Sequence, residues 1–208
     1  FHIGKFEQID DFPMLWTWFE EDQLLSEMGY PRLHSTENEI FTGHHMWDLL
    51  VERICLEYHK KLRDNPNYHH EYTTIIEFSR GTEHGGDARA CDHLSHEIIQ
   101  RSAILYINVS WEEYFRKNRA RFNPMRPNSI LEHGLSDEKI EFLYKEIDWE
   151  EVSASDSNYI NIKGTHVPYV VFENEDDVTT DRGEELGSRL EESLNALWKL
   201  YCSRHGTP

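Results

Sequence analysis

Basic side chains are scarce in this sequence. Its 208 residues contain 21 Lys and Arg against 39 Asp and Glu, which gives a formal net charge of −18. This excess of negative charge argues against a general binder of nucleic acid or of anionic membranes, because both partners would be repelled. With 38% hydrophobic and 12% aromatic residues, the chain is nevertheless too apolar for a disordered acidic tail.

Long apolar runs and paired cysteines are also missing. The best apolar candidates, such as residues 103–109, fall far short of the ~20 residues that a membrane span needs. The three cysteines, Cys55, Cys91 and Cys202, are odd in number and far apart, which is typical of reduced thiols in the cytosol. The chain opens at Phe1 without the charged and apolar regions of a targeting segment. We therefore expect a cytoplasmic protein with no membrane partner.

Hydrophobic patterning predicts strands and helices in alternation. We expect strands over residues 1–9, 73–78, 103–109 and 167–173, and helices over residues 20–28, 44–62, 95–101, 110–122, 136–146 and 182–201. Residues 148–158 are polar and predict a loop. Strands that are continuous apolar runs between helices indicate a mainly parallel sheet covered on both faces. We predict one three-layer α/β domain over residues 1–208.

The most informative stretch runs from Thr74 to Gly81. A hydrophobic strand here delivers Glu77, and then Arg80, to its carboxyl end, where open α/β sheets bind their ligands. A carboxylate at that place can position Mg²⁺ or accept a proton, and an arginine can hold a phosphate with two hydrogen bonds. The alternative is that the two side chains only pair with each other at the sheet edge.

A second stretch concentrates positive charge. Five basic residues fall within residues 116–126, which contain no acid: Arg116, Lys117, Arg119, Arg121 and Arg126. In so acidic a chain, this cluster predicts a local positive field suited to a small polyanion. The following Pro124 and Pro127 indicate that the basic segment leaves its helix as a loop. The alternative is a solvated face that balances Glu112 and Glu113.

In this order, the segments resemble the nucleoside and nucleotide kinases of the P-loop superfamily. Residues 76–80 are similar to the family's acid-then-arginine segment after its third strand. Residues 105–110, followed by 116–121, are similar to its fourth strand and arginine-rich lid, here about residues 116–136. Residues 170–175 are similar to its fifth strand and the loop beside the adenine. The resemblance implies a three-layer P-loop fold with a small lid.

The resemblance also implies roles for particular residues. Glu77 would be the base or magnesium-side acid, and Arg80 would hold acceptor phosphate. Arg116, Arg119 and Arg121 would neutralise the transferred group, and Asn174 would lie near the adenine, with Arg119 also contacting nucleotide. ATP and Mg²⁺ are the implied co-substrate and cofactor, and no metal site made by protein residues alone is implied.

The family's phosphate-binding loop, G-x-x-x-x-G-K-[ST], does not occur in the sequence. Gly4-Lys5 has no upstream glycine, and residues 81–86 contain no lysine. In the family this loop follows the first strand, at the centre of the sheet, and residue 1 here corresponds to the start of the second strand. We therefore expect roughly 20–40 further residues upstream, since a β-loop-α unit has about 30.

Further candidates lie near the first strand. The aromatic region that includes Trp16 can stack a base or cover an apolar acceptor, although core packing or an oligomer contact explains such residues as well. Glu7, Asp10 and Asp11 lie at or after the strand's end and can contact acceptor hydroxyls, or can be plain surface acids. Together with Arg80, we take Glu7, Asp10 and Trp16 as the acceptor-binding candidates.

Thirteen histidines raise the question of a metal. Asp92, His93 and His96 can in principle approach one ion, but no HExxH or Cys/His zinc pattern occurs, so exposed or capping histidines are the favoured reading. Our prediction is a kinase that transfers the γ-phosphoryl group of ATP to a nucleoside, nucleotide or other small metabolite. The alternatives are a catalytically silent nucleotide-binding or scaffold module and, less favoured, a metal-dependent phosphohydrolase. The sequence does not indicate the oligomeric state.

Overall fold

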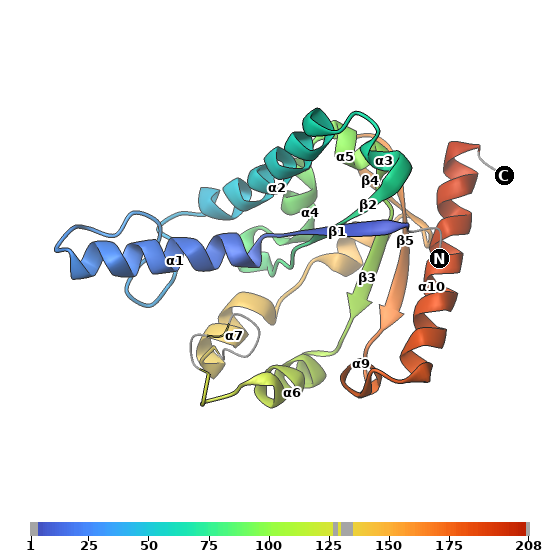
Figure 1. Ribbon diagram of the computed structural model, residues 1–208. Coiled ribbons are helices and arrows are strands. Elements are labelled where there is room, and N and C mark those ends of the chain that lie inside the picture. Colours follow the sequence, from blue (N-terminus) through green and yellow to red (C-terminus); the bar gives the residue numbers. More distant parts are fainter. Residues whose placement is uncertain (1–3, 127–128, 130–134, 207–208) are drawn as a thin grey trace. The chain divides into compact units, whose positions relative to one another are not determined.

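The computed structural model describes residues 4–126, 129 and 135–206, and the chain in it is mixed α/β (Figure 1). It divides into two compact units. The first contains the chain up to Ser95 together with Glu146–Asp148, and the second contains His96–Lys145 and the chain from Trp149 onward. Part of the expected first strand and part of the expected lid (127–128 and 130–134) lie outside the described residues. Each unit is described below by itself.

The first unit carries a two-stranded parallel sheet and the helices around it. Its elements are β1 (Lys5–Asp10), α1 (Phe12–Glu27), α2 (His45–Asp64), α3 (Tyr68–Glu71), β2 (Tyr72–Glu77), the 3₁₀ helix η1 (Thr82–His84) and α4 (Gly86–His93). β1 and β2 pair from Lys5↔Tyr72 to Asp10↔Glu77, so both strands end at the same level. The bounds of β1, α2 and β2 agree with the expectations to within a few residues, whereas α1 begins earlier than expected and α3, η1 and α4 were not predicted.

Helix α1 begins at Phe12, eight residues before the expected start at residue 20. Pro13 lies in the first turn of this helix, where the missing N–H of a proline has no intrahelical partner and therefore costs no hydrogen bond. The aromatic stretch therefore lies on a helix. Leu15, Trp18, Phe41, Met46 and Leu50 form one buried cluster, which confirms core packing as the role of Trp18.

The second unit carries a three-stranded sheet in the order β3-β5-β4. Its elements are α5 (His96–Arg101), β3 (Ile104–Asn108), α6 (Trp111–Arg121), α7 (Asp137–Tyr144), α8 (Trp149–Ser153), β4 (Tyr159–Ile162), β5 (Thr165–Glu173), α9 (Val178–Asp181) and α10 (Glu184–His205). β3 and β5 are parallel, and α10 packs along both of them (Figure 1). Ser110 caps α6 and Ser136 caps α7 through their side-chain oxygens, as their positions before each helix predict.

Three elements of the second unit were not predicted, and one of them is the short helix α9 just before α10. The expected loop over residues 148–158 contains the short helix α8. Strand β4 pairs antiparallel with β5, and the turn between them consists of Lys163 and Gly164, both with positive φ (49° and 80°). A two-residue turn of this kind suits the twist of a hairpin. The alternation in Tyr159–Ile162 followed by Lys-Gly was the sequence signal for it.

The described residues form two small sheets, one parallel and one mixed, where a single mainly parallel sheet was predicted. The expectation that the apolar strands are buried on both faces is also wrong in part, because Ile75 on β2 is 42% exposed and Ile107 on β3 is 46% exposed. β-branched residues favour strands whether or not both faces are covered. Among the helices that the structure describes, none has the length and apolar character needed to cross a bilayer.

Candidate functional site

Acidic side chains gather at the carboxyl end of the β1–β2 pair in the first unit. Asp10 and Glu77 are the last residues of the two strands and lie opposite each other in the register. The Gln8 amide donates to Glu77 Oε2 at 2.8 Å, and the Asp10 carboxylate accepts from the backbone N–H of Phe12 at 2.9 Å. Burial raises the pKa of Glu77, and the nearby charges of Asp10 and Asp11 raise it further. A carboxylate whose pKa is raised binds a proton more readily than an ordinary glutamate, which is the property that a general base needs.

Arg80, three residues after the end of β2, forms a buried ion pair with Asp11. Its guanidinium donates to Asp11 and, at 2.8 Å, to the carbonyl of Ser79. The Arg80 side chain is only 3% exposed, and its guanidinium carbon lies 5.2 Å from the centre of the Trp47 ring. Burial raises the pKa of Asp11, against the opposing effect of Arg80. The role of Arg80 as a clamp for acceptor phosphate stays a prediction, and in that role its guanidinium would have to leave Asp11.

The other two acceptor candidates in this unit have partners of their own. The Glu7 carboxylate accepts from Lys61 Nζ at 2.5 Å and from the Tyr68 hydroxyl at 2.9 Å, and the hydrogen bond from Lys61 lowers the pKa of Glu7. Trp16 is half-buried on α1, with its indole N–H bonded to Glu20 at 2.9 Å. Trp16 thus belongs to the first two turns of α1, which begins two residues after Asp10.

A second pair of carboxylates, Asp87 and Asp148, lies at the start of α4 and was not predicted from the sequence. Asp148 accepts from the backbone N–H groups of Asp87 at 2.7 Å and Ala88 at 3.1 Å. Gly86 has φ +73°, and a Cβ there would lie 2.2 Å from an Asp148 oxygen, so only glycine fits. Burial, followed by the charge of Asp148, raises the pKa of Asp87 from 3.8 to about 7.

Replacing this carboxyl by an amide, Asp87→Asn, should make stability less dependent on pH. A carboxyl whose pKa is raised in the folded state favours folding while it is protonated, and this contribution is lost as pH rises from 3.8 through about 7. We therefore expect the variant to be more stable than wild type above about pH 7. Urea unfolding across this range measures it, with the exposed Glu83→Gln as control. Parallel pH curves for Asp87→Asn and wild type would contradict the assignment.

In the second unit, α6 presents the three predicted lid arginines, two of which are paired with acids. Arg116 donates to Glu113 at 2.6 Å and also to Asp177, and Arg119 pairs with Asp137 and lies over the Phe115 ring. Arg121 is exposed and forms no ion pair within the part of the chain that the structure describes. The pairing of Arg116 with Glu113 supports the balanced-face alternative for that residue.

Lys117, which was not among the predicted site residues, connects α6 to the loop that follows β5. Its ammonium donates to Asn174 Oδ1 at 2.6 Å, to the Asn174 carbonyl at 3.0 Å and to the Asp176 carbonyl at 2.6 Å. The Thr179 hydroxyl donates to the same Asn174 oxygen at 2.9 Å. The loop proposed to lie beside the adenine is thus fixed to the helix that carries the lid arginines.

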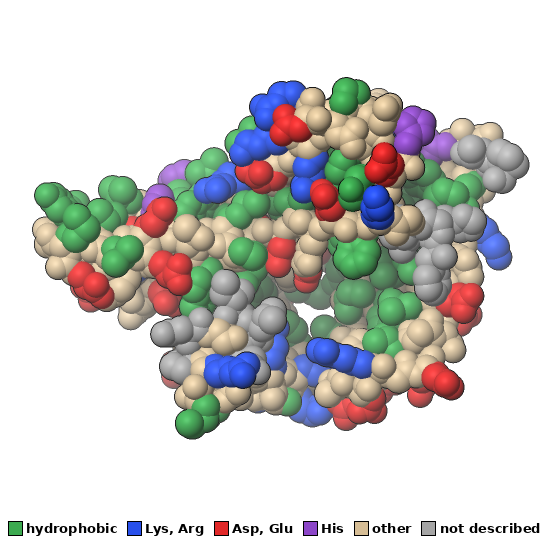
Figure 2. Space-filling view, in the orientation of Figure 1, with side chains coloured by type: hydrophobic (Ala, Val, Ile, Leu, Met, Phe, Trp, Pro, Cys, Tyr) green, Lys and Arg blue, Asp and Glu red, His purple; other side chains and the backbone are tan. Residues whose placement is uncertain are grey.

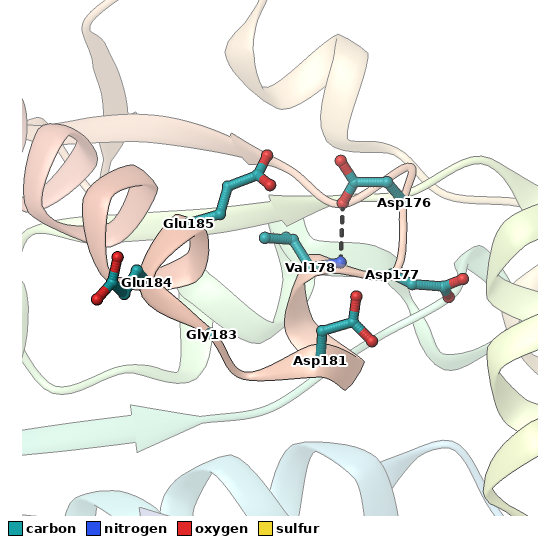
Figure 3. Close-up of a pocket in the computed structure, with 7 residues that line it drawn as sticks. All are labelled: Asp176, Asp177, Val178, Asp181, Gly183, Glu184 and Glu185. Atoms are coloured by element: carbon teal, nitrogen blue, oxygen red, sulfur yellow. Dashed lines mark hydrogen bonds between the residues drawn. The ribbon is translucent and has the colours of Figure 1, made fainter.

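A surface pocket next to this loop is lined almost entirely by acids (Figure 3). Its lining residues are Asp176, Asp177, Val178, Asp181, Gly183, Glu184 and Glu185. Asp176 accepts from the backbone N–H of Val178 at 3.1 Å and pairs with Arg189 at 2.7 Å. So many carboxylates repel a phosphate group, which disfavours binding of nucleotide phosphates in this pocket.

The histidine cluster considered above is not assembled. His93 lies 2.9 Å from Glu52 and 3.4 Å from Asp48, whereas the His96 ring bonds to the Gln100 amide at 2.8 Å. In the described ranges, no group of three or more His, Cys, Asp or Glu side chains is placed to hold a metal ion. The phosphohydrolase alternative therefore gains no support from the geometry.

The structure thus places Asp10 opposite Glu77 and pairs Arg80 with Asp11 in the first unit. In the second unit, the lid arginines lie on α6, the helix whose Lys117 bonds to Asn174. Comparison of the chain with protein-family models, with curated proteins and with solved structures found no match in any of the three. The functional argument therefore depends on the geometry of these residues and on the sequence motifs.

Proposed function

We propose that this chain acts as a small-molecule kinase of the P-loop type, which transfers the γ-phosphoryl group of ATP to a hydroxyl or phosphate of a small acceptor. The observation that carries the proposal is the placement of Glu77 beside Asp10 at the carboxyl end of two parallel strands, with the pKa of Glu77 raised. This is the position at which parallel α/β sheets bind ligands. Phosphoryl transfer needs mainly positioning and charge stabilisation.

The proposal also assigns the mixed α/β chain to a specific fold, the three-layer P-loop domain. Within the described residues, β2 pairs only with β1 and β3 pairs only with β5, so each keeps an edge to which a further parallel strand can bind. Two parallel pairs with open edges support this arrangement.

The roles of the residues combine their side-chain chemistry with what the family resemblance implies. Glu77 accepts the proton of the acceptor hydroxyl or, with Asp10, ligates Mg²⁺, an ion that usually takes one or two carboxylates in addition to substrate phosphates. Arg121, with Arg116 and Arg119, offsets negative charge on the transferred group. Asn174 lies near the adenine of ATP, and Lys117 keeps its loop in place.

The experiment that tests the proposal is a thermal-shift titration of the full-length protein with ATP and Mg²⁺. Ligand that binds only the folded state raises its stability, by about 2.7 kcal/mol at a hundredfold excess over Kd. We expect a saturable rise in Tm with ATP–Mg²⁺ and a smaller one with adenosine. No shift at millimolar ATP would favour the silent scaffold module, the alternative that lacks a nucleotide site.

Among the lid residues, we expect Arg121→Ala to lower turnover more than Arg116→Ala. Arg116 already shares its charge with Glu113 and Asp177, whereas Arg121 forms no ion pair among the described residues. Loss of one such donor costs about 10²-fold in kcat. Steady-state kinetics with the exposed Lys199→Ala as control measures the effect, and equal rates for Arg121→Ala and Lys199→Ala would remove Arg121 from the site.

A further inference from the structure

The C-terminal end of α1 and the loop after it expose a group of large apolar side chains. Leu24 is 58% exposed, Met28 67%, Tyr30 58% and Leu33 64%. We call these four residues the tip patch. Figure 2 shows hydrophobic side chains gathered at the left of the molecule, where Figure 1 places this end of α1. Contiguous exposed apolar groups of this kind mark interaction surfaces.

The tip patch is held in place by a buried carboxylate. Asp22 is fully buried and accepts from the backbone N–H groups of Leu33 at 2.6 Å and Ser35 at 2.6 Å, and from the Ser35 hydroxyl at 2.7 Å. At the helix end, the N–H of Tyr30 bonds to the Leu25 carbonyl at 2.8 Å. These bonds fix the loop in a form that keeps its leucine, tyrosine and methionine outside the core.

The charge around the tip patch has one sign. Residues 12–43 contain six acids and one arginine, a net charge of −5. That arginine, Arg32, bonds to the carbonyl of Ser35 at 3.0 Å and is only 13% exposed. Glu20 and Glu27 accept hydrogen bonds from neutral donors, Trp16 and Gln23. The apolar surface is therefore surrounded by exposed carboxylates whose charge these partners do not cancel.

We infer that the tip patch binds a partner protein through a segment that presents apolar side chains among lysines and arginines. The apolar side chains would cover the exposed leucines and methionine, and the basic ones would meet the surrounding carboxylates. An anionic lipid surface is disfavoured because it carries the same sign of charge. A second copy of this chain is disfavoured because it would bring another −5 against the first.

A labelled peptide of leucine and lysine at helical spacing, added to the full chain, tests the inference by fluorescence anisotropy. We expect saturable binding that weakens as salt is raised. Loss of one buried leucine contact is worth about tenfold in Kd, so Leu33→Ser and Met28→Ser should each weaken binding by about that factor. Glu20→Gln with Glu27→Gln should weaken binding mainly at low salt. All these side chains are exposed or on the surface, so the fold should be kept.

Matched controls separate this surface from general attraction to an acidic protein. Leu56→Ser on α2 (52% exposed) and Glu191→Gln on α10 should bind the peptide as wild type does, and a peptide of the same composition in scrambled order should bind more weakly. Equal binding by the tip and control variants, or no saturable binding, would overturn the inference. Two further results would overturn the inference. One is a dimer of the wild-type chain, detected by sedimentation, that is absent in Leu33→Ser. The other is binding of the wild-type chain to anionic phospholipid vesicles that is lost in the same variant.

Discussion

Replacing Glu77 by glutamine should lower the rate of phosphoryl transfer by about 10²–10⁴-fold, the usual contribution of a general base. The amide keeps the size of the side chain and an oxygen that can accept the Gln8 hydrogen bond, but it cannot take a proton. Glu77 lies at the strand end with much of its side chain exposed and its carboxyl only partly shielded from water, so stability should hardly change. Single-turnover kinetics with saturating ATP–Mg²⁺, alongside urea unfolding, separates the two effects.

The pH dependence adds an independent check on Glu77. Burial raises the pKa of this carboxyl, and a base works only when it is deprotonated, so the acid limb of the wild-type rate profile should lie above the usual range for glutamate. Glu71→Gln is the matched control, because Glu71 lies just before the same strand and pairs only loosely with Lys5 at 3.8 Å. If Glu77→Gln retained the wild-type rate, Glu77 would be a structural partner of Gln8 and no more.

Breaking the buried ion pair should have the largest effect on stability. Arg80→Met leaves the Asp11 carboxylate, itself buried, without its guanidinium, and removal of one partner of a buried pair costs about 3–5 kcal/mol. Asp11→Leu should cost a similar amount. The double variant should lose less than the two single losses together, because neither charge is then left alone.

Urea unfolding of the four proteins in this cycle measures the coupling. Lys5→Met, which removes a solvent-exposed pair with Glu71, should leave stability nearly unchanged. Wild-type stability of Arg80→Met would mean that Arg80 is not committed to Asp11. The guanidinium would then be available to hold acceptor phosphate, as the family resemblance implies.

Elements with a strong local signal could be predicted from the sequence. Helix α2 is marked by an apolar stripe, and helices α6 and α7 are each preceded by a capping serine. These signals lie within the helix or next to it in the sequence, so they can be recognised without the tertiary structure. The hairpin of β4 and β5 was missed, although Lys163-Gly164 marks its turn. The early start of α1 was also missed, because a proline such as Pro13 can either end a helix or fit its first turn, and local sequence does not distinguish the two.

For the candidate site, the sequence could predict only which residues lie at the ends of the strands. Glu77 and Asp10 could be placed because parallel strands end at one edge. The pairing of Asp11 with Arg80, however, joins residues 69 positions apart, and Lys117 reaches Asn174 over 57 positions. Such contacts depend on how helices and strands pack, so no local spacing reveals them. The same holds for Asp22, which looks like one more surface acid in the sequence and is buried in the structure.

The most direct measurement follows both products when the full-length protein is incubated with ATP, Mg²⁺ and a panel of nucleosides, nucleotides and small hydroxyl metabolites. Phosphorus NMR resolves ADP, inorganic phosphate and the phosphorylated acceptor in one sample. A phosphoryl-transfer enzyme should form ADP and phosphorylated acceptor in equal amounts with at least one compound, and Glu77→Gln should slow the formation of both by about 10²–10⁴-fold. ADP with inorganic phosphate alone, or no ADP from a folded protein with any acceptor, would contradict the account.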